Sequence, residues 1–420
     1  MKHTFSFLLL LCMLLLTLAG CDSNTAPADE EGVKAVSLIV DGEVVYFFDE
    51  FTAKNGVSVC PLKTGEWKTL CPDPLCTHEN ECILYGRRYI RGVPDDGKMY
   101  YSAWNIFGEY WKKDDSSCVL GSIDFNTMQY EDYVIYDRSS MLEEFVKCGD
   151  ALYYYLINAD GLYDVLRYDL NSKKETVLYT IDLAVSSLMV SEGHVAFGTG
   201  VGLYLGDLNP QSGKLENVRL AVPMSRSFIY GDICCNLHDG YVYYLSSMYV
   251  PEGESRDSTY TGDYCRFPID GDISQSETVV QNANGSAYFY GSRMYYLPAD
   301  VQLSFIKYYF HDQQSGPDDL PENLMGVSIN KGGIAYYDIE NGEHADFFKK
   351  DNLFIKQIYY MDEEKMIVDA FCTDNVTIGE DRFIEGGYLS YNHNHGYFLI
   401  NLKDNSYHML MQRYPDQGAY

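Results

Sequence analysis

The chain is poor in basic residues. It has 31 Lys and Arg against 61 Asp and Glu, which gives a formal net charge of −30 over 420 residues. Phosphates of nucleic acids and anionic lipid surfaces attract clusters of Lys and Arg, so this balance argues against both as partners. It favours a soluble, exposed protein, with a site for cations or basic partners as the alternative.

Several signatures of common enzymes are also missing. The sequence has no Gly-x-Ser-x-Gly elbow, no His-Glu-x-x-His helix, no phosphate-binding loop and no dinucleotide fingerprint. It also lacks the repeat phrases of sialidases, WD proteins and kelch proteins. Enzymatic activity is therefore uncertain, and its absence is favoured, although two of the many carboxylates could form a glycosidase pair.

Long apolar runs are absent after the N-terminus, where Phe5 to Leu18 follows Lys2. This run is too short for a stable transmembrane anchor and is typical of a cleaved signal. It ends in Leu-Ala-Gly before Cys21, which resembles a bacterial lipobox. We expect a lipoprotein signal over 1–20 and diacylglycerol on Cys21; an ordinary secretory signal with an incidental cysteine is the alternative.

The segment 21–32 is polar and rich in small residues, so we expect a flexible tether. The remainder, 33–420, contains no evident linker and is expected to form one domain. The predicted location is extracytoplasmic, on the outer face of the cell membrane, held there by the lipid alone.

Tyr and Phe are abundant, at 39 and 20 residues, and many follow a tight polar turn. Aromatic residues favour strands. Repetition of the phrase every roughly 40 to 55 residues predicts an all-β array of similar units, a β-propeller. The phrase occurs at Asp41-Gly42, Asp96-Gly97, Gly149-Asp150, Asp239-Gly240 and Gly291-Ser292.

A second phrase, strand, polar turn, strand, occurs seven times and pairs with seven turns of the first kind. Each blade of a propeller has two such hairpins, so the count predicts seven blades. Eight blades are the alternative, with extra strands in Met325 to Lys331 or Gly387 to Asn392. The first kind of turn is expected at Asp41, Asp96, Gly149, Glu192, Asp239, Gly291 and Asp362.

Strands of a blade alternate in direction, so one face of the disc should carry only short turns. We call it the short-turn face, and the opposite one the loop-rich face. Long loops on a rigid scaffold often carry function, so the loop-rich face is the predicted site. Its insertions are expected at 71–87, 103–117, 246–263, 299–324 and 372–385.

Cys71, Cys76, His78 and Cys82 form a dense cluster on one of these insertions. Outside the cytoplasm, clustered cysteines favour a disulfide that staples a loop. Three thiolates and an imidazole could instead hold zinc, although the spacing matches no common zinc module. Free thiols are the third possibility.

Trp104, Tyr110 and Trp111 on the next insertion could form an aromatic platform for a sugar or a protein. Anchoring of the loop to its own blade is the favoured alternative. His393 and His395 could share a metal if they lie on a strand, but a solvated turn is favoured. Other cysteines are expected to be buried thiols: Cys118, Cys148, Cys234, Cys235, Cys265 and Cys372.

The lipobox, the acidic tether and the aromatic repeats together resemble the propeller-type lipoproteins of Gram-positive bacteria, loosely related to TolB-like propellers. The phrase from Cys71 to His78 is the distinctive part of this resemblance. The resemblance implies fold and cellular address. It implies no catalytic residue.

These features together predict a lipid-anchored propeller that binds a protein, peptide or glycan on its loop-rich face without catalysis. One alternative is a surface glycan hydrolase or lyase with carboxylates at the mouth of the propeller. A structural scaffold in an envelope complex is the other, which a large exposed apolar patch would indicate.

Overall fold

The computed structural model describes most of the chain from Glu31 onward and confirms an all-β protein. In the described residues, the secondary structure consists of strands and one short 3₁₀ turn, η3 (Ile273–Gln275). Within the described part there is no helix long and apolar enough to cross a membrane. The described residues are 31–48, 57–70, 87–105, 117–127, 129–137, 142, 144–224, 234–250, 261–298, 303–306, 326–329, 333–374 and 394–412.

Most sheets contain four strands that are consecutive in the sequence. The first sheet contains β2 (Leu38–Asp41), β3 (Val44–Phe48), β4 (Val57–Pro61) and β5 (Lys68–Thr69). The second contains β6 (Arg87–Asp95), β7 (Lys98–Asn105), β8 (Ser117–Asp124) and β9 (Gln129–Asp137). The third contains β1 (Val33–Lys34), β10 (Phe145–Cys148), β11 (Ala151–Ile157), β12 (Tyr163–Asp169) and β13 (Lys174–Ile181).

The remaining sheets follow the same pattern. The fourth contains β14 (Val185–Ser191), β15 (His194–Thr199), β16 (Gly202–Leu208) and β17 (Leu215–Pro223). A seven-stranded sheet contains β18 (Cys235–His238), β19 (Tyr241–Leu245), β20 (Thr261–Pro268), β21 (Glu277–Tyr290), β22 (Arg293–Pro298), β25 (Ile334–Asp338) and β26 (His344–Phe348). The last contains β27 (Leu353–Met361), β28 (Lys365–Cys372), β29 (His395–Asn401) and β30 (Tyr407–Gln412).

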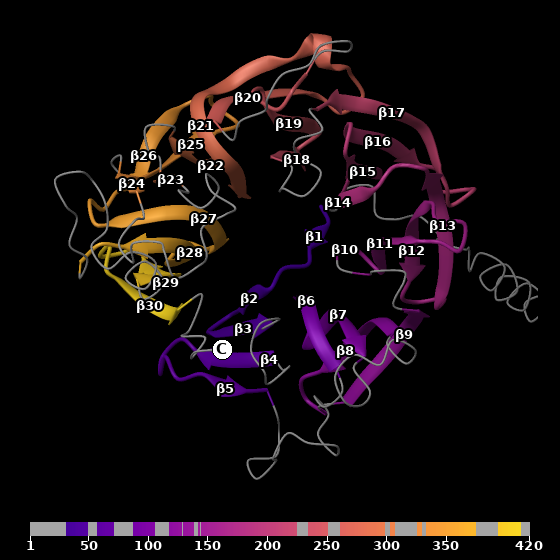
Figure 1. Cartoon of the computed structure of the whole chain (residues 1–420), viewed down its shortest axis with the longest axis horizontal. Coiled ribbons are helices and arrows are strands. Elements are labelled where there is room, and N and C mark those ends of the chain that lie inside the picture. Colours follow the sequence, from indigo (N-terminus) through magenta and orange to yellow (C-terminus); the bar gives the residue numbers. More distant parts are fainter. Residues whose placement is uncertain are drawn as a thin grey trace, which may run out of the picture.

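The sheets follow one another in sequence order around a ring (Figure 1). Neighbouring strands within each sheet are antiparallel, and the first strand of each sheet lies toward the centre of the ring. We call β10, β14, β18 and the second half of β21 inner strands.

The predicted polar turns join the first two strands of a unit at all seven expected positions. At three of them both central residues have positive φ, for example 45° at Asp96 and 75° at Gly97. This is the type I′ geometry that matches the twist of a hairpin, and Gly adopts it without steric cost. The Asp-Gly phrase is therefore repeated because the turn requires it.

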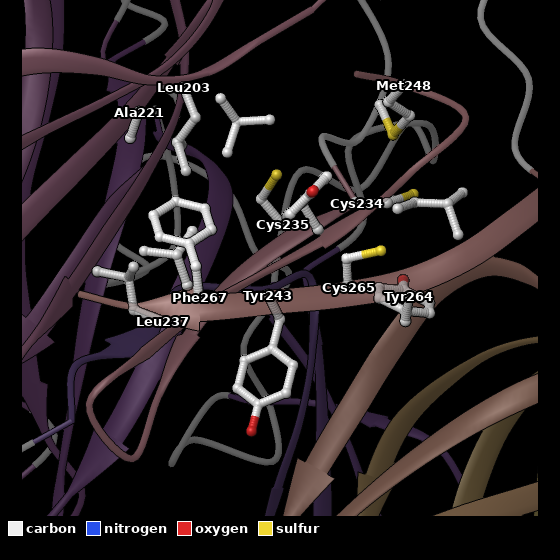
Figure 2. Packing of buried hydrophobic residues seen from close by; sticks show 14 of the residues in the cluster. Leu203, Ala221, Cys234, Cys235, Leu237, Tyr243, Met248, Tyr264, Cys265 and Phe267 are labelled. Atoms are coloured by element: carbon white, nitrogen blue, oxygen red, sulfur yellow. The ribbon is translucent and has the colours of Figure 1, made fainter. Parts of the chain in front are cut away.

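The core lies between adjacent sheets rather than at one centre. One cluster joins the fourth sheet to the seven-stranded sheet through Leu203, Val242 and Phe267, all with no exposed surface. Figure 2 shows part of it, with the sulfur atoms of Cys234, Cys235 and Cys265 among the buried side chains. The aromatic repeats supply much of this packing, as the sequence predicted.

The cysteines expected in strands are buried. Cys235, Cys265 and Cys372 are free thiols, which confirms the prediction for these three. Burial raises the pKa of the Cys235 thiol well above its ordinary value, so it stays protonated. A protonated, enclosed thiol is unreactive.

The first and last sheets pack against each other where the ring closes. Trp67 donates a hydrogen bond from Nε1 to the carbonyl of Leu410 at 2.7 Å, and its ring lies edge-on to Phe47. Lys365 of β28 pairs with Glu43 at 3.3 Å. Among the described strands, closure depends on these side-chain contacts, since neither sheet contains a strand from the other.

The N-terminal segment, residues 31–36, crosses the interior of the ring instead of joining the first sheet (Figure 1). Glu31 forms a bridge with Ser191, and β1 pairs with β10. Val36 then forms a bridge with Gly92 of β6. The segment therefore connects three sheets from the inside.

One of the possible extra strands is present. Within Met325 to Lys331, the strand β24 (Gly326–Ile329) pairs with β23 (Leu303–Ile306) as a separate two-stranded sheet. The other candidate, Gly387 to Asn392, lies outside the described residues.

Candidate functional site

A cavity of about 230 Å³ lies among the inner strands. Its walls come from β10, β14, β18, the second half of β21 and the N-terminal segment, five separate parts of the chain. The volume is below the roughly 300 to 1,000 Å³ typical of sites for drug-sized ligands. It suits a small group or one or two residues of a longer ligand.

One wall carries a carboxylate and an imidazole in contact. Glu31 Oε1 lies 2.6 Å from Nδ1 of His238, and it accepts a hydrogen bond from the N–H of Asp239 at 3.3 Å. The His238 ring packs on Phe289, with ring centroids 4.5 Å apart. The Glu31 side chain is 47% exposed, so the cavity has an accessible negative charge.

A second carboxylate is buried behind the wall. Glu144 accepts a hydrogen bond from the N–H of Leu188 at 2.9 Å and pairs with Lys34 Nζ at 3.2 Å. A buried charge is stable only when it is paired, and Lys34 supplies the pair. Glu144 therefore fixes β14 and the N-terminal segment in place.

The apolar part of the lining includes Leu188, Val190, Ala287 and Phe289. Burial raises the pKa of the nearby Tyr288 phenol above its ordinary value, so this group stays neutral. The cavity thus combines apolar walls with the accessible carboxylate of Glu31 and the ammonium of Lys34, which pairs with Glu144. Apolar walls with a few polar groups are common in ligand sites.

The cavity lies toward the short-turn face. Ser191, His238 and Tyr290 are the last residues of β14, β18 and β21, and the short turns follow directly. The sequence pointed to the opposite, loop-rich face, because it located sites by loop length. Much of the predicted insertions lies outside the described residues.

The residues predicted for ligand binding, lipidation and the cysteine cluster remain predictions. Trp104 belongs to β7, as a residue of a strand rather than of a loop. All others lie outside the described residues, namely Cys21, Cys71, Cys76, His78, Cys82, Tyr110 and Trp111.

The prediction of a solvated turn is wrong for His395. This residue begins β29, is 1% exposed, and its Nε2 lies 2.7 Å from Oδ1 of Asp369 on β28. Asp369 is also 1% exposed. Pairing of the two strands brings this carboxylate beside the imidazole, a contact that His395 and its sequence neighbours did not indicate. Where the structure describes the chain, no group of three or more His, Cys, Asp or Glu could hold a metal ion.

The sequence missed Glu31, Glu144 and His238. Glu31 falls in the segment 21–32 that the sequence predicts as a tether, and the repeated turn and aromatic phrases mark no polar side chain on an inner strand. One signal was present, because His238 directly precedes the Asp239-Gly240 turn. In a propeller such a position is the end of an inner strand, so it lies beside the central space.

No protein-family model and no curated protein matches this chain. Solved structures do match in fold. A puromycin-hydrolysing peptidase from Mycobacterium tuberculosis has a TM-score of 0.52 at 9% identity, over 94% of this chain and 55% of that protein. The β-propeller domain of the Trilobed protease from Pyrococcus furiosus has a TM-score of 0.41 at 11% identity, over 80% of this chain and 99% of that domain.

TolB from Acinetobacter baumannii is a further neighbour, with a TM-score of 0.33 at 10% identity, over 76% of this chain and 64% of that protein. The chain thus has an all-β fold whose structural neighbours include β-propeller and TolB-like proteins. It spans 50% to 60% of the length of the puromycin hydrolases and the related peptidase that it matches.

These comparisons contradict the function predicted from the sequence. A non-catalytic recognition protein was favoured, with a glycan hydrolase or lyase and a scaffold as alternatives. The finding behind this correction is the puromycin-hydrolysing peptidase, which aligns with 94% of this chain at a TM-score of 0.52. At 9% identity this likeness shows the fold of the chain and not its activity.

Proposed function

We propose that this chain is the propeller part of a peptide-hydrolysing enzyme and that its central cavity receives the peptide. The observation that carries the proposal is the cavity itself, with inner strands as walls and the accessible carboxylate of Glu31. The net charge of −30 favours cationic peptides. The likeness in fold to a peptidase supports the reaction class.

We propose that the groups that break the peptide bond lie outside this propeller. The similar peptidase is nearly twice as long as the part that aligns with this chain, which covers 55% of it. In such an arrangement the propeller admits and orients the substrate, and orientation alone accounts for a large part of a catalysed rate.

The test uses the blocked peptide acetyl-Lys-Val-Lys-Val-Lys-amide. Asn236→Trp should fill the cavity, because Asn236 lines it. We expect calorimetric titration to show at least tenfold weaker binding by this variant than by the parent protein. Val177→Trp is the control, since Val177 lies on β13 and is 40% exposed; its binding should be unchanged.

The second readout is hydrolysis. Cells that lack the gene should cleave this peptide more slowly in their envelope fraction. The parent protein and Val177→Trp should restore the rate, and Asn236→Trp should not. Peptide that does not bind, or cleavage that is independent of the gene, would overturn the proposal.

The proposal includes an architecture of seven blades. The seven-stranded sheet divides at β21, whose first part pairs with β20 and whose second part pairs with β22. Division there gives two four-stranded units beside the five other sheets of the ring. The loop-borne pair β23 and β24 is then an insertion and not an eighth blade.

We also propose that Cys21 carries a lipid after removal of residues 1–20, which would hold the propeller at the outer face of the membrane. Cys21→Ser should then move the protein from the membrane fraction to the soluble fraction, because no other anchor is proposed. Fractionation followed by immunoblotting measures this. Retention of the variant in washed membranes would contradict it.

A further inference from the structure

The walls of the cavity are edges of β-strands. β14 and β18 are the end strands of their sheets, and Tyr288 to Tyr290 of β21 pair on one side only, with β22. Three consecutive residues of each of these strands line the cavity. An unpaired strand edge presents N–H and C=O groups that can pair with another extended chain.

The edge of β14 is already covered. The N–H of Leu188 donates to Glu144, and the C=O of Val190 accepts a hydrogen bond from the N–H of Gly32 at 2.7 Å. These two positions are the ones that face away from β15, since edge-facing groups alternate along a strand. The N-terminal segment therefore occupies the place of a neighbouring strand beside β14.

The edge of β18 is covered at one end only. The N–H of Leu245 donates to the C=O of Cys234, so Asn236 and His238 also direct their main-chain groups toward β19. Leu237 and Asp239 must then face the cavity. The N–H of Asp239 bears this out, because it donates to Glu31.

Leu237 is the open position of this edge that lines the cavity. Within the described part of the chain, no backbone hydrogen bond uses its N–H or C=O group. Its side chain is 9% exposed and belongs to the core cluster (Figure 2). Leu237 therefore faces the cavity with its main-chain N–H and C=O groups.

We propose that the cavity binds an extended peptide as an added β-strand, paired with β18 at Leu237. The ligand class is a peptide backbone with N–H and C=O groups, recognised by main-chain hydrogen bonds as in other cases of strand addition. Leu188 and Phe289 form apolar walls beside this strand, and Glu31 faces a basic side chain of the ligand.

This inference rests on the proposed function but can fail separately. The probe is acetyl-Lys-Val-Lys-Val-Lys-amide together with five derivatives, each N-methylated at one residue. Methylation removes one N–H without changing any side chain. We expect about threefold to tenfold weaker binding when the methylated N–H is one that faces β18, and a smaller change at the neighbouring position, because pairing alternates along a strand.

Two protein variants provide a matched comparison. Leu237→Pro removes the edge N–H, and Pro is tolerated at the edge of a sheet. Leu237→Ala keeps that N–H group and removes about as much side-chain packing from the core as Leu237→Pro does. We expect the proline variant to bind about threefold to tenfold more weakly than the alanine variant. If the proline variant does not fold, the methylated peptides and hydrogen exchange of β18 in the parent protein still test strand addition.

The outcomes separate the two proposals. Peptide binding with alternating sensitivity to methylation, and slower exchange at Leu237 with peptide present, supports strand addition. Binding that Asn236→Trp abolishes but that no methylation weakens would leave the proposed function standing and overturn strand addition. Absence of any binding would overturn both.

Discussion

Gly32 lies directly against two strands, and the absence of a side chain makes this contact possible. A Cβ atom at this position would lie 2.4 Å from Cγ1 of Val146 and 2.9 Å from the carbonyl oxygen of Val190. Both distances are shorter than van der Waals contact. The hydrogen bond from Gly32 to Val190, which covers the edge of β14, depends on this close approach.

Gly32→Ala should therefore lower the free energy of unfolding by about 1 to 3 kcal/mol, the usual cost of an inserted methyl group in a packed site. Urea denaturation measures it. The control is Val33→Ala, since Val33 is 56% exposed and its loss should change stability by less than about 0.5 kcal/mol. Equal stability of the two variants would show that residues 31–36 are not held against the inner strands.

At the scale of single elements, the hairpins that join the third and fourth strands of a unit are stabilised by the same kind of hydrogen bond. A carboxylate or amide near the start of the turn accepts backbone N–H groups from residues two or three positions further on. Asp124, Asp169, Asn209, Asp338 and Asn401 act in this way. These side chains replace backbone partners in a tight turn, which explains why Asp and Asn recur there.

Asp169 is the most informative of these residues to change. It accepts from the N–H of Ser172 at 2.7 Å and from Nη2 of Arg167 at 2.9 Å. Asp169→Ala should destabilise the protein by about 1 to 3 kcal/mol in urea denaturation at pH 7. Asp160→Ala is the control, because Asp160 is exposed in a turn; no change above about 0.5 kcal/mol is expected.

The effect should depend on pH. Burial raises the pKa of the Asp169 carboxyl, but the hydrogen bonds from Ser172 and the charge of Arg167 outweigh it and leave the pKa below its ordinary value. The folded state thus binds the proton less well than the unfolded state, whose pKa is about 3.9. The stabilisation is present above that pH and is lost as pH falls through the folded pKa. A difference between parent and Asp169→Ala that stays constant down to pH 2 would contradict this account.

For the whole molecule, closure of the ring decides whether the sheets behave as one unit. Trp67 connects the first sheet to Leu410 of the last one, and Ile367, Tyr397 and Leu410 belong to the cluster between them. Repeat arrays are stabilised by contacts between neighbours, so an open interface would leave two exposed ends.

Trp67→Ala should cost about 1 to 3 kcal/mol, less than a fully buried Trp, because Trp67 is half-buried. We expect faster hydrogen exchange in β2 and β30, which lie on the two sides of the closure, while β15 in the fourth sheet should be unaffected. Trp67→Phe keeps an aromatic ring but loses the hydrogen bond and part of the packing surface, so its cost should lie between about 1 kcal/mol and that of Trp67→Ala. Unchanged exchange in β2 and β30 would show that other contacts close the ring.

The sequence by itself determined the strands and the short turns. Turn geometry and strand preference depend on neighbouring residues, so the repeated turn phrases, together with the second hairpins that pair with them, located all seven first hairpins correctly. Only the tertiary structure decided the cavity, the contact of Glu31 with Asp239, which lies 208 positions further along the chain, and the burial of His395 beside Asp369. These features depend on which strands meet around the ring and on where the N-terminal segment crosses it, and neither is encoded in a local pattern.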